Sequence, residues 1–333
     1  MTEPFDALLV LSFGGPEGRE QVLPFLDNVL KGRAVPQERK LAVARHYYHF
    51  GGVSPINQAN RDLLSALDVA LQDQRPSLQL FWGNRNWRPF LPDTLLAMRA
   101  RGVRRALVFV TSAFSSYSGC RQYLENLDSA RDRVGDGAPE LVVLRRFYNH
   151  PLFISAMADR VREAVAQVGG DPSEITIVFT AHSIPMGMSR GCDYVQQFEE
   201  ASKLTAESAG VQHWQLAYQS RSGPPQVPWL EPDILDALEA LAAQGRRRVV
   251  VCPIGFVSDH MEVVWDLDQE AQQEAEALGL AFARAKTAGT HPDYVAMVRE
   301  LVLEHTAGAA PRALGQFGPR VSPCRPGCCP ARS

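Results

Sequence analysis

Three carboxylates stand at a spacing that could bind a metal ion or relay protons. Glu262, Asp266 and Glu270 follow one another at four-residue intervals in a segment whose pattern predicts a helix. That spacing places all three on one helical face. Like charges so placed repel one another, and no Lys or Arg occurs between residues 258 and 283 to neutralise them. A hard divalent cation, which oxygen ligands bind well, would supply the missing positive charge.

The alternative interpretation is an ordinary solvated face, because most acidic helix faces simply meet water. Two features favour a site. The acidic segment follows a predicted buried strand, and open α/β sheets place their ligands where strands end. The opposite helical face is apolar, with Val263, Val264 and Leu267, so we expect the helix to pack with its carboxylates turned away from the core.

A histidine also stands at a strand end. His182 lies in TAHSIP, residues 180–185. A lone histidine is often only structural or solvated, but in this position it could accept a proton near neutral pH or bind a metal. No predicted strand runs directly into a G-x-S-x-G elbow, so we do not expect a hydrolase triad. The Gly-rich SFGGPEG at 12–18 lacks full dinucleotide-binding spacing, and we expect only a tight turn there.

These side chains need a scaffold, and the chain predicts an α/β one. Apolar, strand-like runs alternate with helical patterns, which is typical of parallel sheets with crossover helices. The predicted strands cover residues 7–13, 78–84, 106–112, 141–147, 175–181, 214–220, 248–254 and 280–285.

The series of strands and helices runs twice, which predicts two similar Rossmann-like domains with a cleft between them. We place the domains at residues 1–150 and 151–308. Residues 309–333 form a tail that is rich in Pro, Gly and Arg and holds too few apolar residues to fold alone. The tail must therefore be disordered or be held by its cysteines.

Composition excludes several classes of protein. The 333 residues carry a net charge of −3, which gives no nucleic-acid footprint. No apolar run approaches a membrane span, and the first residues, MTEPFDALLVLSF, carry no basic leader. We therefore expect a cytoplasmic protein without an integral membrane segment.

Five motifs, spread in order over nearly the whole chain, carry a resemblance to a known family. They are LLVLSFGGPEG (8–18), HYYHFGGVSPIN (46–57), VFTAHSIP (178–185), YQSRSGPPQVPWLEPD (218–233) and PIGFVSDHMEVVWDLD (253–268). Together they resemble ferrochelatases, and most of all the actinobacterial branch, which also carries a cysteine-bearing tail. The resemblance implies an enzyme of haem biosynthesis that inserts Fe²⁺, as a substrate, into a porphyrin held between two Rossmann-like domains.

The resemblance also implies roles for the polar residues. His182 and Glu262 correspond to the family's His and Glu, and we expect them to face each other across the macrocycle. Two pyrrole N–H protons leave as iron enters, so a base must stand at the ring. One of the two residues binds iron and the other takes protons, in an order left open. Asp266 and Glu270 match an acidic ladder that could carry Fe²⁺ inward or protons outward.

The porphyrin is an apolar plate with anionic rims, so its site needs apolar walls and cationic or hydroxyl anchors. The resemblance points to coproporphyrin III as the porphyrin. Some relatives have Tyr where this chain has Phe13, which cannot bind iron, and a basic residue where it has His46. The expected porphyrin-binding residues are Phe13, Lys31, Arg33, His46, Tyr47, Ser54 and Ser220. For the basic loop at 31–33, plain solubility is the alternative.

Cysteines crowd the end of the chain, with Cys324, Cys328 and Cys329 in its last ten residues. Some ferrochelatases bind a [2Fe–2S] cluster through three tail cysteines and an internal one, and a cluster needs four thiolates. Cys120, at a predicted helix start that favours the thiolate, is the expected fourth ligand, with Cys192 as the alternative. A zinc site or a group of free thiols is the other interpretation of the tail.

Three other functions compete with iron insertion: a haem or porphyrin carrier, an iron–sulfur sensor, and a cobalt chelatase of similar fold. A carrier does not need a histidine and an acidic ladder at its ligand. The stretch that matches the apolar lip of dimeric, membrane-associated relatives is polar here, FGGVSPINQANRDLL at 50–64, so we expect a monomer.

Overall fold

The structure is a computed structural model that describes residues 4–32, 35–74, 78–320, 324 and 327–330. The chain divides into two compact units, each described by itself below. Unit 1 comprises Met1–Thr111, Tyr123–Leu144 and Val302–Ala309; unit 2 comprises Ser112–Gln122, Arg145–Leu301 and Ala310–Ser333.

Unit 1 is built on a parallel sheet whose described strands follow the order β2-β1-β3-β4. All pairings are parallel, as crossover helices between strands require. The strands are β1 (Ala7–Ser12), β2 (Gln79–Asn84), β3 (Arg105–Val110) and β4 (Glu140–Val143).

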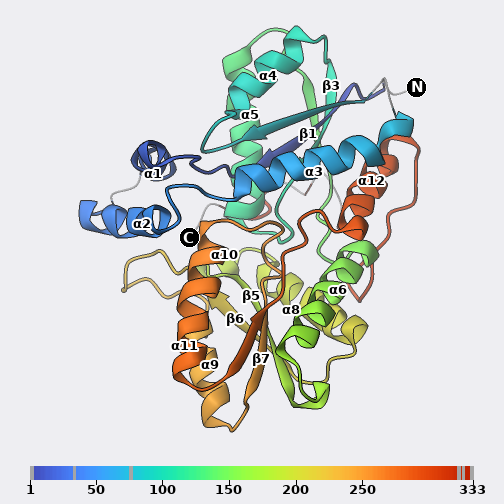
Figure 1. The fold of residues 1–333 in the computed structure, drawn as a ribbon. Helices are drawn as coiled ribbons and strands as arrows, with labels where there is room; N and C mark the ends of the chain where they lie inside the picture. Colours follow the sequence, from blue (N-terminus) through green and yellow to red (C-terminus); the bar gives the residue numbers. More distant parts are fainter. Residues whose placement is uncertain (1–3, 33–34, 75–77, 321–323, 325–326, 331–333) are drawn as a thin grey trace. The chain divides into compact units, whose positions relative to one another are not determined.

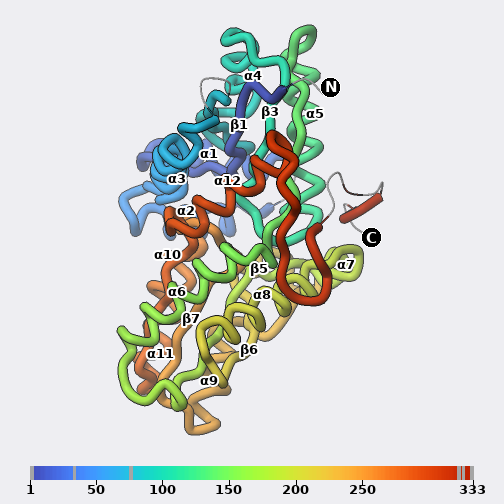
Figure 2. Tube along the Cα trace, turned by 90° about the vertical axis from the view of Figure 1, so that its right-hand side faces the viewer, coloured from blue at the N-terminus to red at the C-terminus, as the bar shows by residue number. Residues whose placement is uncertain are grey.

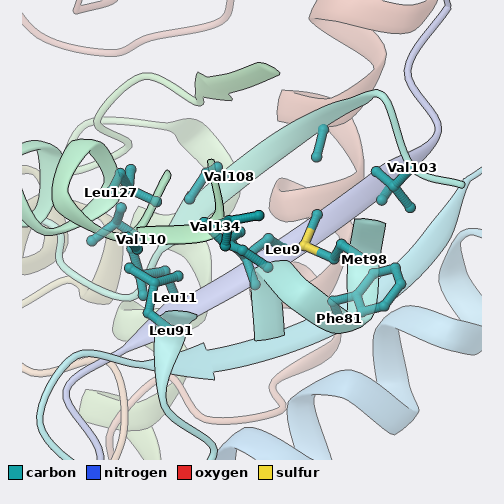
Figure 3. Packing of buried hydrophobic residues seen from close by; sticks show 14 of the residues in the cluster. Leu9, Leu11, Phe81, Leu91, Met98, Val103, Val108, Val110, Leu127 and Val134 are labelled. Atoms are coloured by element: carbon teal, nitrogen blue, oxygen red, sulfur yellow. The ribbon is translucent and has the colours of Figure 1, made fainter. Parts of the chain in front are cut away.

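One face of this sheet packs on two helices (Figure 3). Alternate residues of a strand share a face, so Leu9 and Leu11 of β1 point to the same side as Val108 and Val110 of β3. Leu127 of the helix α5 (Gln122–Val134) closes the cluster with residues of α4 (Leu91–Ala100). This buried layer makes the sheet of unit 1 a firm base for the loops at its carboxyl edge.

Unit 2 repeats the arrangement (Figure 1). Its described strands follow the order β6-β5-β7-β8, again all parallel. They are β5 (Ile175–His182), β6 (Trp214–Gln219), β7 (Arg248–Cys252) and β8 (Ala281–Arg284). In both units the strand that comes second in the unit's sequence (β2 or β6) lies at the edge of the sheet, and the strand that comes first (β1 or β5) lies beside it. The predicted repeat of two Rossmann-like sheets is therefore confirmed.

The helices α6 and α8 lie side by side in unit 2, while α9 and α11 pack with β6 and β8 (Figures 1 and 2). The helices not yet named are α1 (Val22–Val29), α2 (Gln37–His49), α3 (Ile56–Ala70), α6 (Pro151–Val168), α7 (Met186–Ser189), α8 (Tyr194–Ala209), α9 (Ile234–Ala243), α10 (Met261–Trp265), α11 (Gln272–Ala277) and α12 (Pro292–Thr306). Short 3₁₀ turns cover Arg19–Gln21, Gln72–Gln74 and Pro172–Glu174, and π-helical segments cover Tyr117–Arg121 and Asp266–Ala271.

The described part of the tail is held by polar contacts as well as by its cysteines. The buried side-chain amide of Asn149 donates to the backbone carbonyls of Leu314 (3.1 Å) and Gly318 (2.9 Å). Arg320 pairs with Asp193 at 2.5 Å. Pro330, a described residue of the tail, lies close to Gly191, just after α7. The expectation of a tail either disordered or held by cysteines alone was therefore incomplete, because sequence patterns do not show which buried amide binds a distant backbone.

The domain boundaries at 150 and 308 remain a prediction about independently folding parts. Contacts within the structure group 112–122 with unit 2 and 302–309 with unit 1. Limited proteolysis would show which boundaries separate stable fragments.

Candidate active site

His182 ends the strand β5, at the carboxyl edge of the sheet of unit 2. Its partner in the neighbouring strand is Gln219, the last residue of β6. The acidic segment begins shortly after β7, at the N-terminus of α10. All three strands thus deliver side chains to one edge, where ligands of open α/β sheets bind.

Two hydrogen bonds hold His182 in place, one to its ring and one to its backbone. Nδ1 of His182 lies 2.5 Å from the carbonyl oxygen of Ser183, and because that oxygen only accepts, Nδ1 carries a hydrogen. The hydroxyl of Tyr194 donates to the carbonyl of His182 at 2.8 Å. Nε2 is therefore the ring nitrogen that remains for chemistry.

Glu262 meets that nitrogen directly. Nε2 of His182 lies 3.5 Å from Oε1 of Glu262. A flat ring between them would need about 3.5 Å on each face, or about 7 Å in all. In this structure the two residues stand side by side in direct contact, without the gap that a macrocycle between them would need. How they lie about a bound porphyrin stays a prediction.

The pair is an ion pair at neutral pH. Burial by itself would lower the pKa of His182, but the Glu262 carboxylate outweighs it and raises that pKa to about 9. Burial would raise the pKa of Glu262, but the charge of His182 lowers it to about 2. Because 48% of the Glu262 side chain is exposed, water screens the interaction and limits its contribution to stability.

The helix that carries the carboxylates is not a continuous α-helix. After α10 it passes through the π-helical segment Asp266–Ala271 before α11 begins. In an α-helix, a residue four positions on lies about 40° past a full turn. The wider π turn falls short of a full turn over the same four residues. The rotation about the helix axis from Glu262 to Asp266 is thus partly reversed between Asp266 and Glu270. The three carboxylates therefore form a straighter row along the helix than a continuous α-helix would give.

The opposite face of this helix is apolar, as predicted. Val263 and Leu267 are fully buried and join Ala271 and Ala275 in the core of unit 2. Val264, expected on the same face, is half-buried. This packing is what turns the acidic row away from the core.

Asp266 holds the middle of the row. Burial raises its pKa, the hydrogen bond from Ser220 opposes that rise, and the charges of Glu262 and Glu270 add to it, so the pKa reaches about 7. Asp266 is therefore the carboxyl group of this row that changes protonation near neutral pH.

Part of the negative charge of the acidic segment is neutralised by an arginine. Arg284, at the end of β8, binds Asp268 at 2.5 and 2.8 Å and Asp259 at 3.2 and 3.3 Å. It stands just beyond the stretch that lacks basic residues, and parallel pairing of β7 with β8 brings it back to the helix. Within the described part of the chain, neither Lys nor Arg pairs with the three carboxylates of the row.

Unit 1 carries most of the expected porphyrin contacts. Phe13 follows β1 and is 37% exposed. The Phe25 ring contacts both Phe13 (6.4 Å between centroids) and the buried Tyr47 (5.7 Å). Ser54 is buried next to the Gly-rich turn, where a side chain on Gly15 would collide with it. The close approach of Ser54 therefore leaves no room for a side chain at Gly15.

The remaining expected contacts of unit 1 are less well placed. His46 lies on α2, where burial and the charge of Arg45 lower its pKa. Lys31 is exposed after α1, and Arg33 lies outside the described residues. In unit 2, the hydroxyl of Ser220 donates to Asp266, so this side chain touches the acidic row.

One cysteine of unit 2, Cys120, contacts a buried arginine. Cys120 lies in the π-helical segment Tyr117–Arg121, and Arg146 donates to its sulfur at 3.0 Å. The hydrogen bond from Cys329 and the charge of Arg146 lower the pKa of Cys120. The sulfurs of Cys328 and Cys329 are 3.6 Å apart.

The other cysteines differ in their surroundings. Cys324 is exposed, yet it interacts with Cys328 and Cys120. Cys192 donates to the carbonyl of Met188 at 3.3 Å. Cys252 is fully buried in β7, and burial raises its pKa. Among the described residues, no three His, Cys, Asp or Glu side chains are arranged around a single metal position.

Comparison with known proteins decides between the competing functions. The family model described as Ferrochelatase matches residues 5–306. The chain belongs to the ferrochelatase family.

Relatives of the ferrochelatase family match over almost their whole length. A "Ferrochelatase" of Rhodopirellula baltica is 52% identical over 98% of this chain and 93% of its own. "Coproporphyrin III ferrochelatase" of Mycolicibacterium smegmatis is 50% identical over 97% of this chain and 99% of its own. The same-named protein of Mycobacterium tuberculosis is 51% identical over 98% and 96%.

Solved structures agree on the fold. SirB from Bacillus subtilis has a TM-score of 0.55 at 12% identity and covers 90% of this chain and 96% of its own. CbiX has a TM-score of 0.53 at 14% identity and covers 90% and 99%. At such low identity these likenesses concern the two-sheet chelatase fold alone.

As a ferrochelatase, the chain is an enzyme that inserts Fe²⁺ into a porphyrin in haem biosynthesis. The carrier, iron–sulfur sensor and cobalt-chelatase alternatives are not favoured. Among the described residues, no helix combines the length and apolar character that a bilayer crossing needs.

Proposed function

We propose that the porphyrin substrate is coproporphyrin III. The observation that carries this proposal is the near full-length match, at about half identical residues, to relatives named coproporphyrin III ferrochelatase. Coproporphyrin III has four carboxylates where protoporphyrin IX has two, so its site needs more cationic and hydroxyl anchors.

The test is a direct comparison of kcat/KM for the two porphyrins with Fe²⁺ under anaerobic conditions. We expect coproporphyrin III to be favoured by at least about tenfold, the equivalent of about 1.4 kcal/mol. Equal values, or a preference for protoporphyrin IX, would overturn the proposal.

We assign the anchors to unit 1. Tyr47 and Ser54 offer hydroxyls, Lys31 and Arg33 offer positive charge, and Phe13 offers an apolar face. His46 is the pH-dependent member of the set, since its pKa is lowered by burial.

Lys31→Met should raise the KM of coproporphyrin III and leave the KM of Fe²⁺ unchanged.

For the chemistry, we propose that His182 and Glu262 act together on one face of the ring. At neutral pH His182 already holds a proton that Glu262 stabilises. Its Nε2 must release that proton before it binds iron or takes a pyrrole proton. When a cation binds to Glu262, the carboxylate no longer stabilises the charged imidazolium of His182. The pKa of His182 then falls, which favours loss of the proton from Nε2. One of the pair binds iron and the other takes the proton.

We propose that Asp266 and Glu270 form the path between this pair and solvent. Carboxylate oxygens bind hard cations reversibly. With a pKa of about 7, Asp266 also exchanges protons readily at physiological pH. The row can therefore serve Fe²⁺ moving inward and the two pyrrole protons moving outward.

We further propose a [2Fe–2S] cluster held by Cys120, Cys324, Cys328 and Cys329. The donor set fits, because each iron of such a cluster takes two thiolates, and the four thiols interact in a chain of close contacts. Such a cluster therefore does not require three protein ligands around one metal position. When bound, the cluster would link the tail to the body of unit 2.

The buried Arg146 supports this assignment. Its guanidinium donates to Cys120, to the carbonyl of Ser112 (2.7 Å) and to that of Gly119 (2.5 Å). A buried cation needs an anionic partner, and the Cys120 thiolate supplies it. Arg320, whose Nη2 lies 3.7 Å from the sulfur of Cys328, adds a second positive charge.

Anaerobically purified protein should be coloured and contain iron and acid-labile sulfide. Cys120→Ser should lose both, while Cys252→Ser, whose thiol is buried in β7, should keep them. If Cys192→Ser loses the cluster and Cys120→Ser does not, the fourth ligand is Cys192. A colourless protein that carries only zinc would overturn the cluster itself.

We also propose that the protein is a cytoplasmic monomer. The polar stretch at 50–64 supports the monomer. Light scattering behind size exclusion tests this, and a mass of twice 36.7 kDa would contradict it.

A further inference from the structure

The end of strand β6 carries an unusual backbone. Ser220, the residue after β6, has a φ of +64°. This is the left-handed region, which residues with a Cβ enter at a cost and hold only where the surroundings require it. A serine, and not a glycine, holds this position.

The hydroxyl reaches across to the acidic helix. Oγ of Ser220 donates to Oδ2 of Asp266. The fully buried Gln219 adds to this contact, because its Nε2 donates to the backbone carbonyl of Glu262 at 3.0 Å and lies 3.4 Å from Oδ2 of Asp266. Two acceptors at one nitrogen also fix which end of the amide points to the helix.

These bonds hold the helix where it changes form. Glu262 lies in α10, and Asp266 opens the π-helical segment. The Gln219–Ser220 pair thus binds the last α-helical turn and the first π-helical residue together. Both bonds to Asp266 fall on Oδ2, and among the described contacts Oδ1 receives none, which leaves it to a cation or a proton.

We propose that Ser220 is a positioning residue for Asp266 and that it acts on iron delivery instead of on the porphyrin. By holding Oδ2, it turns Oδ1 into the row between Glu262 and Glu270. Removing the hydroxyl should free the Asp266 carboxylate to rotate, and the row would lose its middle member.

Two substitutions separate this role from others. Ser220→Gly removes the hydroxyl and suits the left-handed backbone, so the fold should survive. Ser220→Asn also tolerates that backbone and restores a donor to Asp266. Ser222→Gly is the matched control, since this exposed serine lies in the same loop.

The measurement is the KM for Fe²⁺ and the KM for coproporphyrin III in each variant. In Ser220→Gly we expect the KM for Fe²⁺ to rise about tenfold, the size of a lost hydrogen bond to a charged group, with the KM for porphyrin unchanged. Ser220→Asn should return the KM for Fe²⁺ towards the wild-type value, and Ser222→Gly should change neither.

Other results would overturn the proposal in distinguishable ways. A rise in the KM for porphyrin alone would make Ser220 a porphyrin contact. No change in either KM would leave it a turn residue only. Because each variant is compared with wild type on the same porphyrin, these outcomes do not depend on which porphyrin is preferred.

Discussion

At the scale of single residues, the contact between His182 and Glu262 governs the site. Nδ1 of His182 is committed to the Ser183 carbonyl, so Nε2 alone faces Glu262. The protonation of the imidazole then depends on the carboxylate. Without it, burial, which favours the neutral ring, would be opposed only by the hydrogen bond to Ser183 and the charge of Asp266.

Glu262→Gln should therefore lower the pKa of His182 from its value of about 9. NMR titration of the His182 ring signal, assigned by its absence in His182→Ala, measures this directly. An unchanged midpoint would mean that the carboxylate does not control the imidazole.

The same pair makes stability depend on pH in a defined window. The pKa of His182 is raised on folding, so its contribution is complete below 6.5 and is lost as pH rises through about 9. The pKa of Glu262 is lowered, so its contribution is complete above 4.5 and is lost as pH falls through about 2. The gap in stability between wild type and Glu262→Gln should be widest from pH 4.5 to 6.5.

That gap should be about 1 kcal/mol, because water reaches both side chains. Urea unfolding of the two proteins at pH 5.5 and pH 9 measures it. A gap that widens at pH 9 would contradict the ion pair.

The sequence identified both residues of this pair but not their arrangement. His182 stood out at a strand end and Glu262 on an unpaired acidic face, and both signals are local. Which side of a ligand each occupies depends on how the loop after β7 returns to β5, and no local pattern encodes that path. Ser183 and Tyr194 were missed for the same reason, because they act through backbone groups.

At the scale of elements, the acidic helix is held from two sides. The Gln219–Ser220 end of β6 binds its first turns, and Arg284 at the end of β8 binds Asp268 and Asp259. Arg284 is largely buried, with 15% of its side chain exposed. Its charge neutralises two carboxylates in or just before this helix.

Arg284→Met should lower the free energy of unfolding by about 2 kcal/mol, since it leaves two half-buried carboxylates without their cation. Urea denaturation gives the value. Lys286→Met, an exposed position two residues further on, should change it by less than about 0.5 kcal/mol. Equal effects of the two substitutions would show that Arg284 contributes no more than surface charge.

The elements themselves could be predicted well. Each of the eight predicted strands has a counterpart within a few residues, because buried parallel strands appear as continuous apolar runs between turn residues. The π-helical segment was not predicted, because the spacing of apolar residues predicts a helix without distinguishing a π turn from an α turn. Arg284 escaped notice because its partners are distant in sequence.

At the scale of the whole molecule, the two units share one strand order, and unit 2 alone holds the His182–Glu262 pair and the cysteines. The tail belongs to unit 2 and is held there by Asn149, which is fully buried. A chain segment without helices or strands needs such contacts to satisfy its backbone.

Asn149→Ala should loosen the tail. Loss of two hydrogen bonds from a buried amide should cost about 2 kcal/mol and expose residues 310–320 to proteases. Limited trypsin digestion followed by mass spectrometry detects the cut at Arg312 or Arg320. Gln316→Ala is the control, because Gln316 donates to Glu200 through its backbone and its side chain is exposed. An intact tail in Asn149→Ala would show that its other contacts, such as the Arg320–Asp193 ion pair, suffice to hold it.

A double-mutant cycle on His182 and Glu262 tests most directly whether the two residues act as one unit on one face of the porphyrin. The kcat for Fe²⁺ insertion is measured in His182→Ala, Glu262→Ala and the double variant, with folding checked by circular dichroism. We expect each single change to cost about 10²- to 10⁴-fold and the double variant to lose no more than about threefold beyond the worse single one. Losses that multiply would place the residues in separate steps or on opposite faces, and full activity in both single variants would remove them from the reaction.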